Sequence, residues 1–534
     1  MRIGAVRIGE ISVCWVVAVF LGLGCGRLED PADLVIINGP EPESLDPAMI
    51  TSQADGRVVL ALFEGLTRFN ASSADPEPGI AASWDISDDG LVYTFDIRPE
   101  AAWSTSEPIT ANDVLYSWRR ILEPATACEY AGLLFCIRNA REYTTGHLND
   151  PAQIGLSVLS DHEFRVELAQ PTAYFLDICA LPNFAVVPRR AIEQSGDRWL
   201  MKQPVPTSGA YSLDSWRLND RIRLRRNPHY WDAANTRLDR VDLLPCSNAN
   251  TALNLYETGA VDIVWDKELA PSELIDLLVT RPDFHRFDTL GTYFIRLNVT
   301  RVPFDDARVR QALAMAIDKK LIVGKITRGG ERATDQFVPP ILPGYHSPPG
   351  LEYDPEKARE LLAEAGFPGG LDFPPMEYMY NNTGKNHERI AVELQAMWGR
   401  ELGVSVNLRK LESKVYLRAQ ALLEYHACRS SWIGDYSDPN TFLEVFLSDS
   451  GNNRTGWKDL RYDKLLRQAN GEPDPARREE LLRSAESILI QEGVPIIPLY
   501  IYSGLEYYDG TKIGGIHSNS RGEHPLRAIH RLQQ

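Results

Sequence analysis

Few residues in this chain lie in patterns that could carry out a chemical reaction. His387 and Glu388 form half of the zinc-binding pattern of metalloproteases, but no second histidine follows at the required helical spacing. The GxSxG nucleophile elbow, HExxH, the P-loop and a GxGxxG loop after a strand are absent from the sequence. Because a catalytic triad can assemble from distant positions, a peptidase is not excluded. The pattern nevertheless disfavours an enzyme, and we expect no metal or cofactor.

The cysteines form no metal-binding or redox pattern either. Seven occur, with no CxxC pair, and five of them follow residue 25, namely Cys128, Cys136, Cys179, Cys246 and Cys428. An odd number leaves at least one free thiol in an oxidising compartment. We expect buried, unreactive thiols. A bridge between Cys128 and Cys136 is compatible with their short spacing, and this question stays open.

The N-terminus has the features of an export signal. Arg2 and Arg7 precede an apolar run at 11–23. This run is shorter than the roughly 20 residues that a membrane-spanning helix needs. The run ends in Leu21-Gly22-Leu23-Gly24-Cys25, which resembles a bacterial lipobox although glycine stands where leucine is usual, three positions before the cysteine. We therefore predict a signal peptide at 1–24, lipidation of Cys25 and an anchored tether at 25–32. The alternative is an ordinary secretory signal followed by an incidental cysteine.

The composition is that of a large folded protein. Of the 534 residues, 44% are hydrophobic and 24% are charged, which excludes a disordered or collagen-like chain. A chain of this length can bury most of its apolar surface without disulfide bonds. The 73 acidic residues outnumber the 56 basic ones, so the net charge is −17. Because nucleic-acid binding requires a basic surface, we expect no nucleic acid among the partners.

Strands and helices alternate along the chain. Runs of continuous or alternating apolar residues predict short strands at 34–37, 93–97 and 164–168. Thr110 and Asp354 occupy the positions of helix N-caps, and a proline follows Asp354 in the first turn. This mixture predicts an α/β fold with more than one lobe. Since no low-complexity linker separates the parts, we expect the lobes to be interleaved along the chain.

Many short motifs follow one another from near the start of the chain to beyond residue 440. They are Ser44-Leu45-Asp46-Pro47, Leu62-Phe63-Glu64-Gly65-Leu66, Ala82-Ser83-Trp84, Thr110-Ala111-Asn112-Asp113, Ser117-Trp118-Arg119-Arg120, Gly209-Ala210-Tyr211, Arg226-Asn227-Pro228, Tyr230-Trp231, Gly259-Ala260-Val261-Asp262, Pro303-Phe304-Asp305-Asp306, Ala363-Glu364-Ala365-Gly366 and Trp432-Ile433-Gly434-Asp435-Tyr436. In this order they resemble the bacterial extracellular solute-binding proteins of family 5, and most closely the oligopeptide-binding proteins of peptide ABC importers. Thr105-Ser106 and Ser208 depart from the family pattern at turn positions.

The resemblance implies a periplasmic-binding-protein-like class II fold, in which two hinged α/β lobes close on a ligand and an extra domain is added. It divides the chain into a first lobe (33–63, 189–290 and 503–534), an extra domain (64–188) and a second lobe (291–502). It also implies a monomer outside the cytoplasm that captures oligopeptides and delivers them to permease subunits in the membrane. Alternatives with the same fold bind dipeptides, a murein peptide, a metal chelate or a sugar.

The resemblance also assigns the charged groups that would hold the two ends of a peptide. Asp435 matches the family's acidic residue for the peptide ammonium. Arg429 matches the guanidinium for the peptide carboxylate, a group that suits the planar fork of arginine. His387 matches a second carboxylate-side residue, used at another peptide length. The family's further lysine corresponds to Thr327 here, so the adjacent Arg328 is our candidate for that cation.

The remaining implied site residues would contact the peptide backbone or line the pocket. They are Ser431, Trp432 and Ile433 on a backbone-pairing strand, Thr51, Ser52 and Gln53 opposite them in the first lobe, and the aromatic residues Trp432, Tyr130 and Tyr502. In relatives from enteric bacteria a disulfide joins the positions that are Gly291 and Ile433 here. This chain lacks that bridge.

Overall fold

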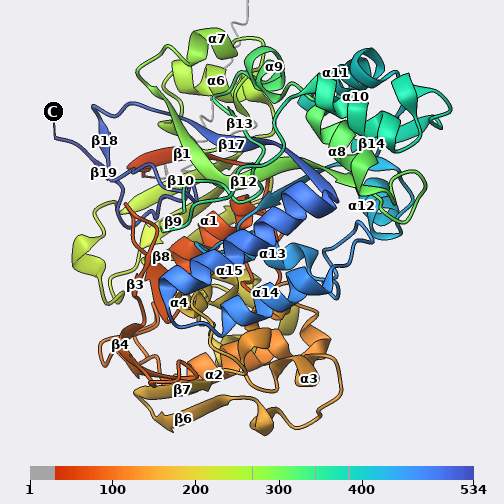
Figure 1. Cartoon of the computed structure of the whole chain (residues 1–534). Coiled ribbons are helices and arrows are strands. Elements are labelled where there is room, and N and C mark those ends of the chain that lie inside the picture. The colour runs from red at the N-terminus through yellow and green to blue at the C-terminus, as the bar shows by residue number, and fades with distance from the viewer. Residues whose placement is uncertain (1–29, 267–268, 343, 383–384, 534) are drawn as a thin grey trace, which may run out of the picture.

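One mixed sheet runs through the computed structural model, which describes residues 30–266, 269–342, 344–382 and 385–533 (Figure 1). In this part of the chain the sheet has eleven strands in the order β15-β14-β16-β12-β17-β11-β1-β10-β9-β8, with β13 beside β17. In that order their bounds are Val406–Leu411, Met376–Asn381, Ala427–Ile433, Phe284–Leu297, Ile496–Tyr508, Ile263–Val264, Leu34–Gly39, Arg240–Pro245, Arg221–Arg226 and Tyr211–Arg217, with β13 at Arg332–Ala333. Parallel and antiparallel neighbours both occur, and the helices packed on the sheet confirm the predicted α/β class.

The predicted signal peptide, the lipidation site Cys25 and most of the tether lie outside the described residues. None of the helices that the structure does describe combines the length and the apolar character needed to cross a membrane.

Helices cover the sheet because alternate strand residues point to opposite faces. In β1, Ile36 packs in one core with α1, and its neighbour Ile37 packs in another core with α6 and α7. In the predicted second lobe, α8 to α11, α12, and α13 to α15 pack in three further cores. The α-helices outside the extra domain are α1 (Gln53–Leu62), α5 (Arg189–Ser195), α6 (Ala249–Glu257), α7 (Ile275–Leu278), α8 (Ala307–Met315), α9 (Lys319–Ile322), α10 (Pro355–Glu364), α11 (Lys385–Leu402), α12 (Ser413–Ala421), α13 (Asn440–Leu443), α14 (Leu460–Asn470) and α15 (Pro475–Ser487).

The predicted helix starts are confirmed. Helix α10 begins at Pro355, and the side chain of Asp354 accepts the backbone N–H of Lys357 at 2.9 Å. Thr110 precedes the first residue of α2, and its backbone N–H donates to the carboxylate of Asp113 at 2.8 Å. Both contacts satisfy N–H groups that would otherwise lack partners at a helix start.

The residues of the predicted extra domain, 64–188, form separate small sheets and most of one core, at the bottom of Figure 1. Its four-stranded sheet has the order β4-β5-β7-β6, and a second, two-stranded sheet pairs β2 with β3. The core includes Trp118, Phe164 and Phe175, whose rings meet edge to face. The elements are β2 (Thr67–Phe69), β3 (Pro76–Pro78), β4 (Ala81–Ile86), β5 (Val92–Ile97), α2 (Ala111–Leu122), α3 (Ala140–Thr144), β6 (Leu156–Ser160), β7 (Glu163–Glu167) and α4 (Phe175–Ala180).

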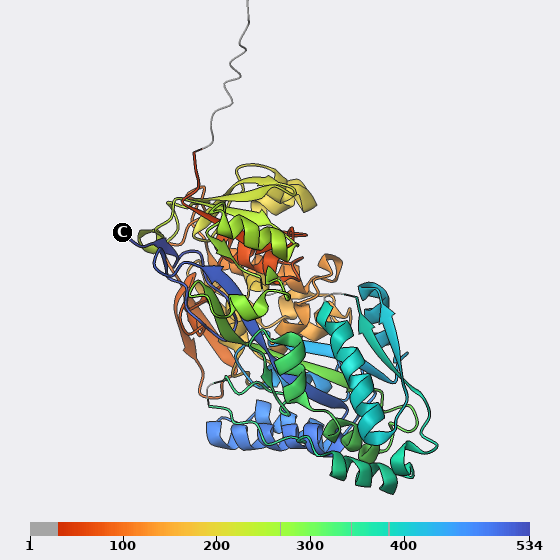
Figure 2. The same cartoon turned by 90° about the horizontal axis from the view of Figure 1, so that it is seen from above.

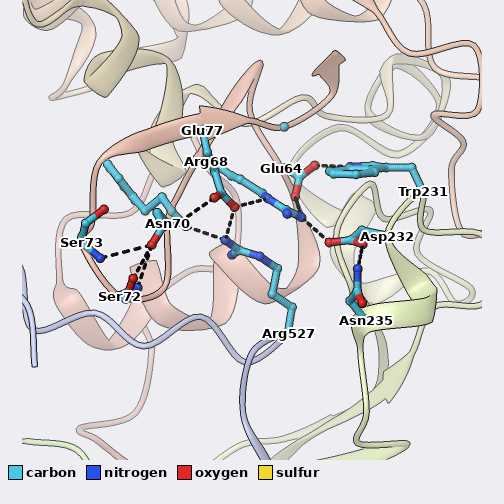
Figure 3. A network of polar contacts seen from close by, with 12 residues as sticks. Glu64, Arg68, Asn70, Ser72, Ser73, Glu77, Trp231, Asp232, Asn235 and Arg527 are labelled. Atoms are coloured by element: carbon cyan, nitrogen blue, oxygen red, sulfur yellow. Dashed lines mark hydrogen bonds and ion pairs between the residues drawn. The ribbon is translucent and has the colours of Figure 1, made fainter. Parts of the chain in front are cut away.

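A polar network fastens the extra domain to the first lobe (Figure 3). Arg68, on β2, donates to Glu77 at 2.9 Å within the extra domain and to Asp232 of the first lobe at 2.9 Å. Arg527, from the C-terminal segment, reaches the same Glu77 at 3.3 Å, and the indole N–H of Trp231 donates to Glu64 at 2.6 Å. Because several half-buried ion pairs share these groups, the network holds the two parts together more firmly than an isolated surface pair would.

β12 and β17 connect the two predicted lobes, as Figure 2 shows from above. Their antiparallel pairing is regular up to Asp288 and Ser503 and resumes at Thr292 and Ile501, so the register breaks at 289–291. The predicted boundaries between the lobes fall inside this break. The ladder is interrupted there, so we expect this part of the strands to absorb a change of backbone angle. The division into domains stays a prediction.

The described cysteines are free thiols, so Cys128 and Cys136 are not bridged in this structure. Cys179 and Cys428 are fully buried, as expected of unreactive thiols, and burial raises the pKa of both. The other three are partly buried.

Candidate functional site

Arg429 lies on β16 with a guanidinium that has no acidic partner. Its Nη2 donates to the hydroxyl of Tyr502 at 3.4 Å, and its guanidinium carbon lies 5.2 Å from the ring centre of Tyr293. Its Nε is fully buried and has no hydrogen-bond partner. Among the described residues no carboxylate lies within ion-pair distance of this group. A desolvated charge without a counter-ion is costly, so the arrangement is suited to bind an anion.

His387 lies close to this guanidinium group. It comes from the first turn of α11, and its Nδ1 is 3.5 Å from the hydroxyl of Tyr293. The two rings are 5.7 Å apart between centres. The structure therefore brings Arg429 and His387, both predicted for the carboxylate side, together around Tyr293 with Tyr502, which was predicted to line the pocket.

Asp435 follows β16 and carries the second unpaired charge. Its backbone N–H donates to the hydroxyl of Thr441 at 3.0 Å, and its carbonyl accepts from Arg521 at 2.9 Å. Its carboxylate accepts no hydrogen bond within the described part of the chain. Burial raises the pKa of this carboxyl to about 6, although Arg521 acts in the opposite direction. Burial and the charge of Asp435 together raise the pKa of Tyr130 to about 12, which places Tyr130 near the carboxylate.

One edge of β16 is open between these charges. All seven residues of β16 pair with β12, but only Ala427 and Cys428 pair with β14 on the other side. From Arg429 to Ile433 the second edge has no strand partner among the described residues. Ser431, Trp432 and Ile433, the predicted backbone-pairing residues, lie on this edge.

Gly291 and Ile433, the positions of the bridge in enteric relatives, lie opposite each other in β12 and β16. A Cβ atom at Gly291 would be 2.4 Å from the Cδ1 of Ile433. Isoleucine therefore fills the space that a second side chain would occupy. Trp432, the next residue along β16 from Ile433, has a buried indole N–H without a partner.

Other predicted site residues do not contact the cluster around Arg429 and Tyr293. Arg328 forms an ion pair with Asp276 at 2.5 Å and donates to the carbonyl of Ser272 at 3.1 Å. Its assignment to a peptide carboxylate stays a prediction and would require that pair to open. Thr51, Ser52 and Gln53 are exposed at the start of α1, where the Ser52 hydroxyl caps the helix by accepting the N–H of Asp55 at 3.1 Å. Whether these three contact a ligand stays untested.

Three residues of the site were not predicted from the sequence. Tyr293 faces Ser431 across the strand pair, and Arg521 and Thr441 hold the backbone of Asp435. Tyr293 could have been inferred from strand alternation, because it lies two residues after Gly291. Arg521 is 86 residues from its partner, and no local signal connects them.

The site offers unlike charges and an open strand edge. In the described ranges no group of three or more histidine, cysteine, aspartate or glutamate side chains is placed to hold a metal ion. The arrangement can bind an extended molecule with a cation at one end and an anion at the other.

The model of the family described as "Bacterial extracellular solute-binding proteins, family 5 Middle" matches residues 75–454. The chain belongs to this family. The periplasmic oligopeptide-binding protein OppA of Salmonella typhimurium is 36% identical over 487 residues, covering 89% of this chain and 88% of that protein. The oligopeptide-binding protein OppA of Bacillus subtilis is 33% identical over 478 residues, covering 87% of this chain and 86% of that protein.

Solved structures of family 5 proteins have the same fold. A periplasmic oligopeptide-binding protein of Borrelia burgdorferi superposes with a TM-score of 0.82 at 31% identity, covering 94% of this chain and 100% of that one. Haemophilus influenzae OppA, in complex with RPPGFSPFR, gives a TM-score of 0.79 at 28% identity with the same coverage. This family 5 solute-binding protein thus has the class II periplasmic-binding-protein fold, and both the predicted family and the predicted fold are confirmed.

Proposed function

We propose that this protein is the substrate-binding component of a bacterial peptide ABC importer and that it captures oligopeptides between its lobes. The observation that carries the proposal is a pair of opposite charges, Arg429 on β16 and Asp435 just after it, neither of which has a counter-ion among the described residues. Arg429 and Asp435 are six positions apart in the sequence. Even a fully extended chain of six residues spans only about 22 Å, so a short peptide can reach both charges. Asp435 would bind the peptide ammonium, and Arg429 and His387 its carboxylate.

The peptide backbone would add a strand to the open edge of β16. Main-chain hydrogen bonds to Ser431 and Ile433 supply affinity without reading side chains, which suits a receptor for many sequences. Trp432, Tyr130 and Tyr502 would line the pockets. No chemical step is needed, since ligand binding would shift the population toward the closed arrangement by bending β12 at 289–291 and β17 at 502, where their register breaks.

We further infer an extracytoplasmic protein, anchored by a lipid at Cys25, that acts as a monomer and delivers peptides to permease subunits. Relatives named as periplasmic support the location. The anchor and the permease rest on the sequence motifs and on the family.

Relatives at similar identity bear the names of other ligands. They include a dipeptide-binding protein, a murein peptide-binding protein and a probable deoxycholate-binding protein. Two charges of opposite sign favour a free peptide over a sugar, a bile acid or a metal chelate, since none of these carries an ammonium.

Native mass spectrometry of the purified protein tests this choice of ligand, because co-purifying peptides would give ligand class and length together. Turnover of a fluorogenic peptide library would contradict a receptor and favour a peptidase.

Peptide affinity is expected to fall as the pH drops below about 6. Burial raises the pKa of Asp435 to about 6, so the ligand-free site gains a proton below that pH and loses its attraction for an ammonium. We expect affinity at pH 5 to be about tenfold below that at pH 7, because about one site in ten is then ionised. Calorimetry from pH 5 to 7.5 measures this, with the N-acetylated peptide as control. An equal pH dependence for both peptides would exclude Asp435 as the cause.

A further inference from the structure

The extra domain contacts the segment that carries Asp435, residues 434–440, which we call the Asp435 segment. Tyr174, the residue before α4, stacks on Tyr436 with ring centres 3.9 Å apart and planes 5° apart. The hydroxyl of Tyr174 accepts from the side-chain amide of Asn440 at 3.1 Å. Asp177, within α4, accepts the backbone N–H of Ser437 at 3.3 Å. Two hydrogen bonds and a ring stack therefore join the extra domain to the second lobe within the five residues that follow Asp435.

The first lobe contacts the same segment through its C-terminal part. Arg521 donates to the carbonyl of Asp435 at 2.9 Å, and its guanidinium carbon lies 4.1 Å from the ring centre of Phe69 in the extra domain. Ser520 accepts the backbone N–H of Leu290 at 2.6 Å, beside the break in register between β12 and β17. The Asp435 segment is thus held by the two parts of the protein that do not contain it.

These contacts link two bodies. The network around Arg68, Glu77, Asp232 and Arg527 fastens the extra domain to the first lobe (Figure 3). The Asp435 segment belongs to the second lobe, which is connected to the first through β12 and β17. A rotation of the second lobe at 289–291 would therefore change the distance between Tyr174 and Tyr436. The extra domain and the first lobe would keep their relative positions, because the network in Figure 3 joins them.

Next to these contacts a cavity separates part of the two surfaces. This cavity of about 560 Å³ lies between Ser87–Gly90 and 171–173 of the extra domain and the region of α15 in the second lobe. Asp438 borders this cavity and is held within its own lobe by two 2.8 Å hydrogen bonds from Arg478. The contacts of Tyr174 and Asp177 thus lie beside a cavity, which Ser437 helps to line.

Carboxylates outside the Asp435 segment contact it and add negative charge that an ammonium would offset. Glu444 accepts from the hydroxyl of Tyr436 at 2.8 Å and from Asn440 at 3.1 Å. Burial raises the pKa of Glu444 to about 7 and that of Asp177 to about 6, as it does for Asp435. Closure without a ligand therefore places several carboxylates in a low-dielectric environment, where a bound cation stabilises them.

We propose that the extra domain is a latch for the amino terminus of the ligand, in which Tyr174 and Asp177 are positioning residues that hold the Asp435 segment in the closed arrangement. The role of the latch in binding rests on the proposed peptide ligand, whereas the contacts of Tyr174 and Asp177 are present whatever the ligand is. It gives the extra domain a role in coupling ammonium binding to closure of the lobes.

The test compares Tyr174→Ala, Tyr174→Phe, Asp177→Ala and Asp177→Asn with the wild type. Loss of the ring stack and of one hydrogen bond is expected to weaken peptide affinity about tenfold in Tyr174→Ala, with the loss in the dissociation rate. Tyr174→Phe keeps the stack and should lose less. Asp177→Asn keeps an acceptor for Ser437 and should fall between Asp177→Ala and the wild type. Tyr143→Phe is the matched control, because it removes a tyrosine hydroxyl bonded to Glu123 inside the same domain.

A second measurement does not depend on peptide. Small-angle scattering of the ligand-free proteins should give a larger radius of gyration for Tyr174→Ala than for the wild type and Tyr143→Phe, because the lobes separate more readily. Equal radii, or wild-type dissociation rates in both alanine variants, would overturn the latch and leave the proposed function standing. If no peptide bound even the wild type, the proposed function would fail, and the scattering result would still decide the latch. Should Tyr174→Ala not fold, Tyr174→Phe and the Asp177 pair carry the test.

Discussion

Replacing Asp435 with asparagine is expected to weaken binding of peptides with a free amino terminus by about 10- to 150-fold, the value of a hydrogen bond to a charged group. The substitution keeps the shape of the side chain and removes the negative charge, which has no partner among the described residues. Calorimetry with a tri- and a tetrapeptide measures the loss. The N-acetylated peptides, which lack the ammonium, should bind the variant and the wild type equally weakly.

The same variant should not be less stable than the wild type when no ligand is present. Burial raises the folded-state pKa of Asp435 to about 6, well above the value of about 3.9 for an unperturbed aspartate. The ionised carboxylate therefore destabilises the folded protein increasingly as pH rises from about 4 to about 6, and the cost stays constant above that. Thermal unfolding at pH 4 and pH 7.5 measures this, with the exposed Asp449→Asn as control. Lower stability of Asp435→Asn at pH 7.5 would show a structural role for the carboxylate.

Replacing Arg429 with methionine is expected to reduce affinity for free-acid peptides by about 10- to 150-fold and to leave affinity for the C-terminal amides almost unchanged. The guanidinium would form its charged hydrogen bonds only with the peptide carboxylate, because no acidic side chain of the described residues reaches it. Competition assays with matched acid and amide peptides give the ratio directly. Equal losses for both forms would exclude the carboxylate role.

Arg429→Met should also unfold at a temperature equal to or above that of the ligand-free wild type. An unpaired charge with a buried Nε costs free energy, and methionine fills a similar volume without that cost. Peptide should then stabilise the wild type but not the variant. The exposed Arg418→Met, in α12 of the same lobe, is the matched control. Marked destabilisation of Arg429→Met would assign the residue to packing against Tyr293 and not to ligand binding.

Much of the fold could be predicted because its signals are local. Thr110 and Asp354 cap their helices through residues three positions away, so the short sequence around each carries the whole signal. The strands predicted at 34–37 and 93–97 extend by only one or two residues in the structure, to Leu34–Gly39 and Val92–Ile97. The ordered motifs then led to the family and the fold class.

The site could be predicted only where a motif carried it. Asp435 and Arg429 were proposed from their neighbours in sequence, and the structure places both beside an open strand edge. Arg328 shows the limit of this reasoning, because its ion pair with Asp276 joins residues 52 positions apart. Ser52 shows it as well, because a residue predicted to contact a ligand also caps α1.

By itself, the sequence determined the family, the α/β class, the helix starts and the two charges most suited to the ends of a peptide. Each of these depends on residue types at short spacing. Only the tertiary structure decided that those charges lack a counter-ion among the described residues, that Arg521 and Thr441 hold the backbone of Asp435, and that Tyr174 of the extra domain stacks on Tyr436. Desolvation and the absence of a counter-ion are sums over every segment that packs against a group, and those segments meet only when the chain has folded.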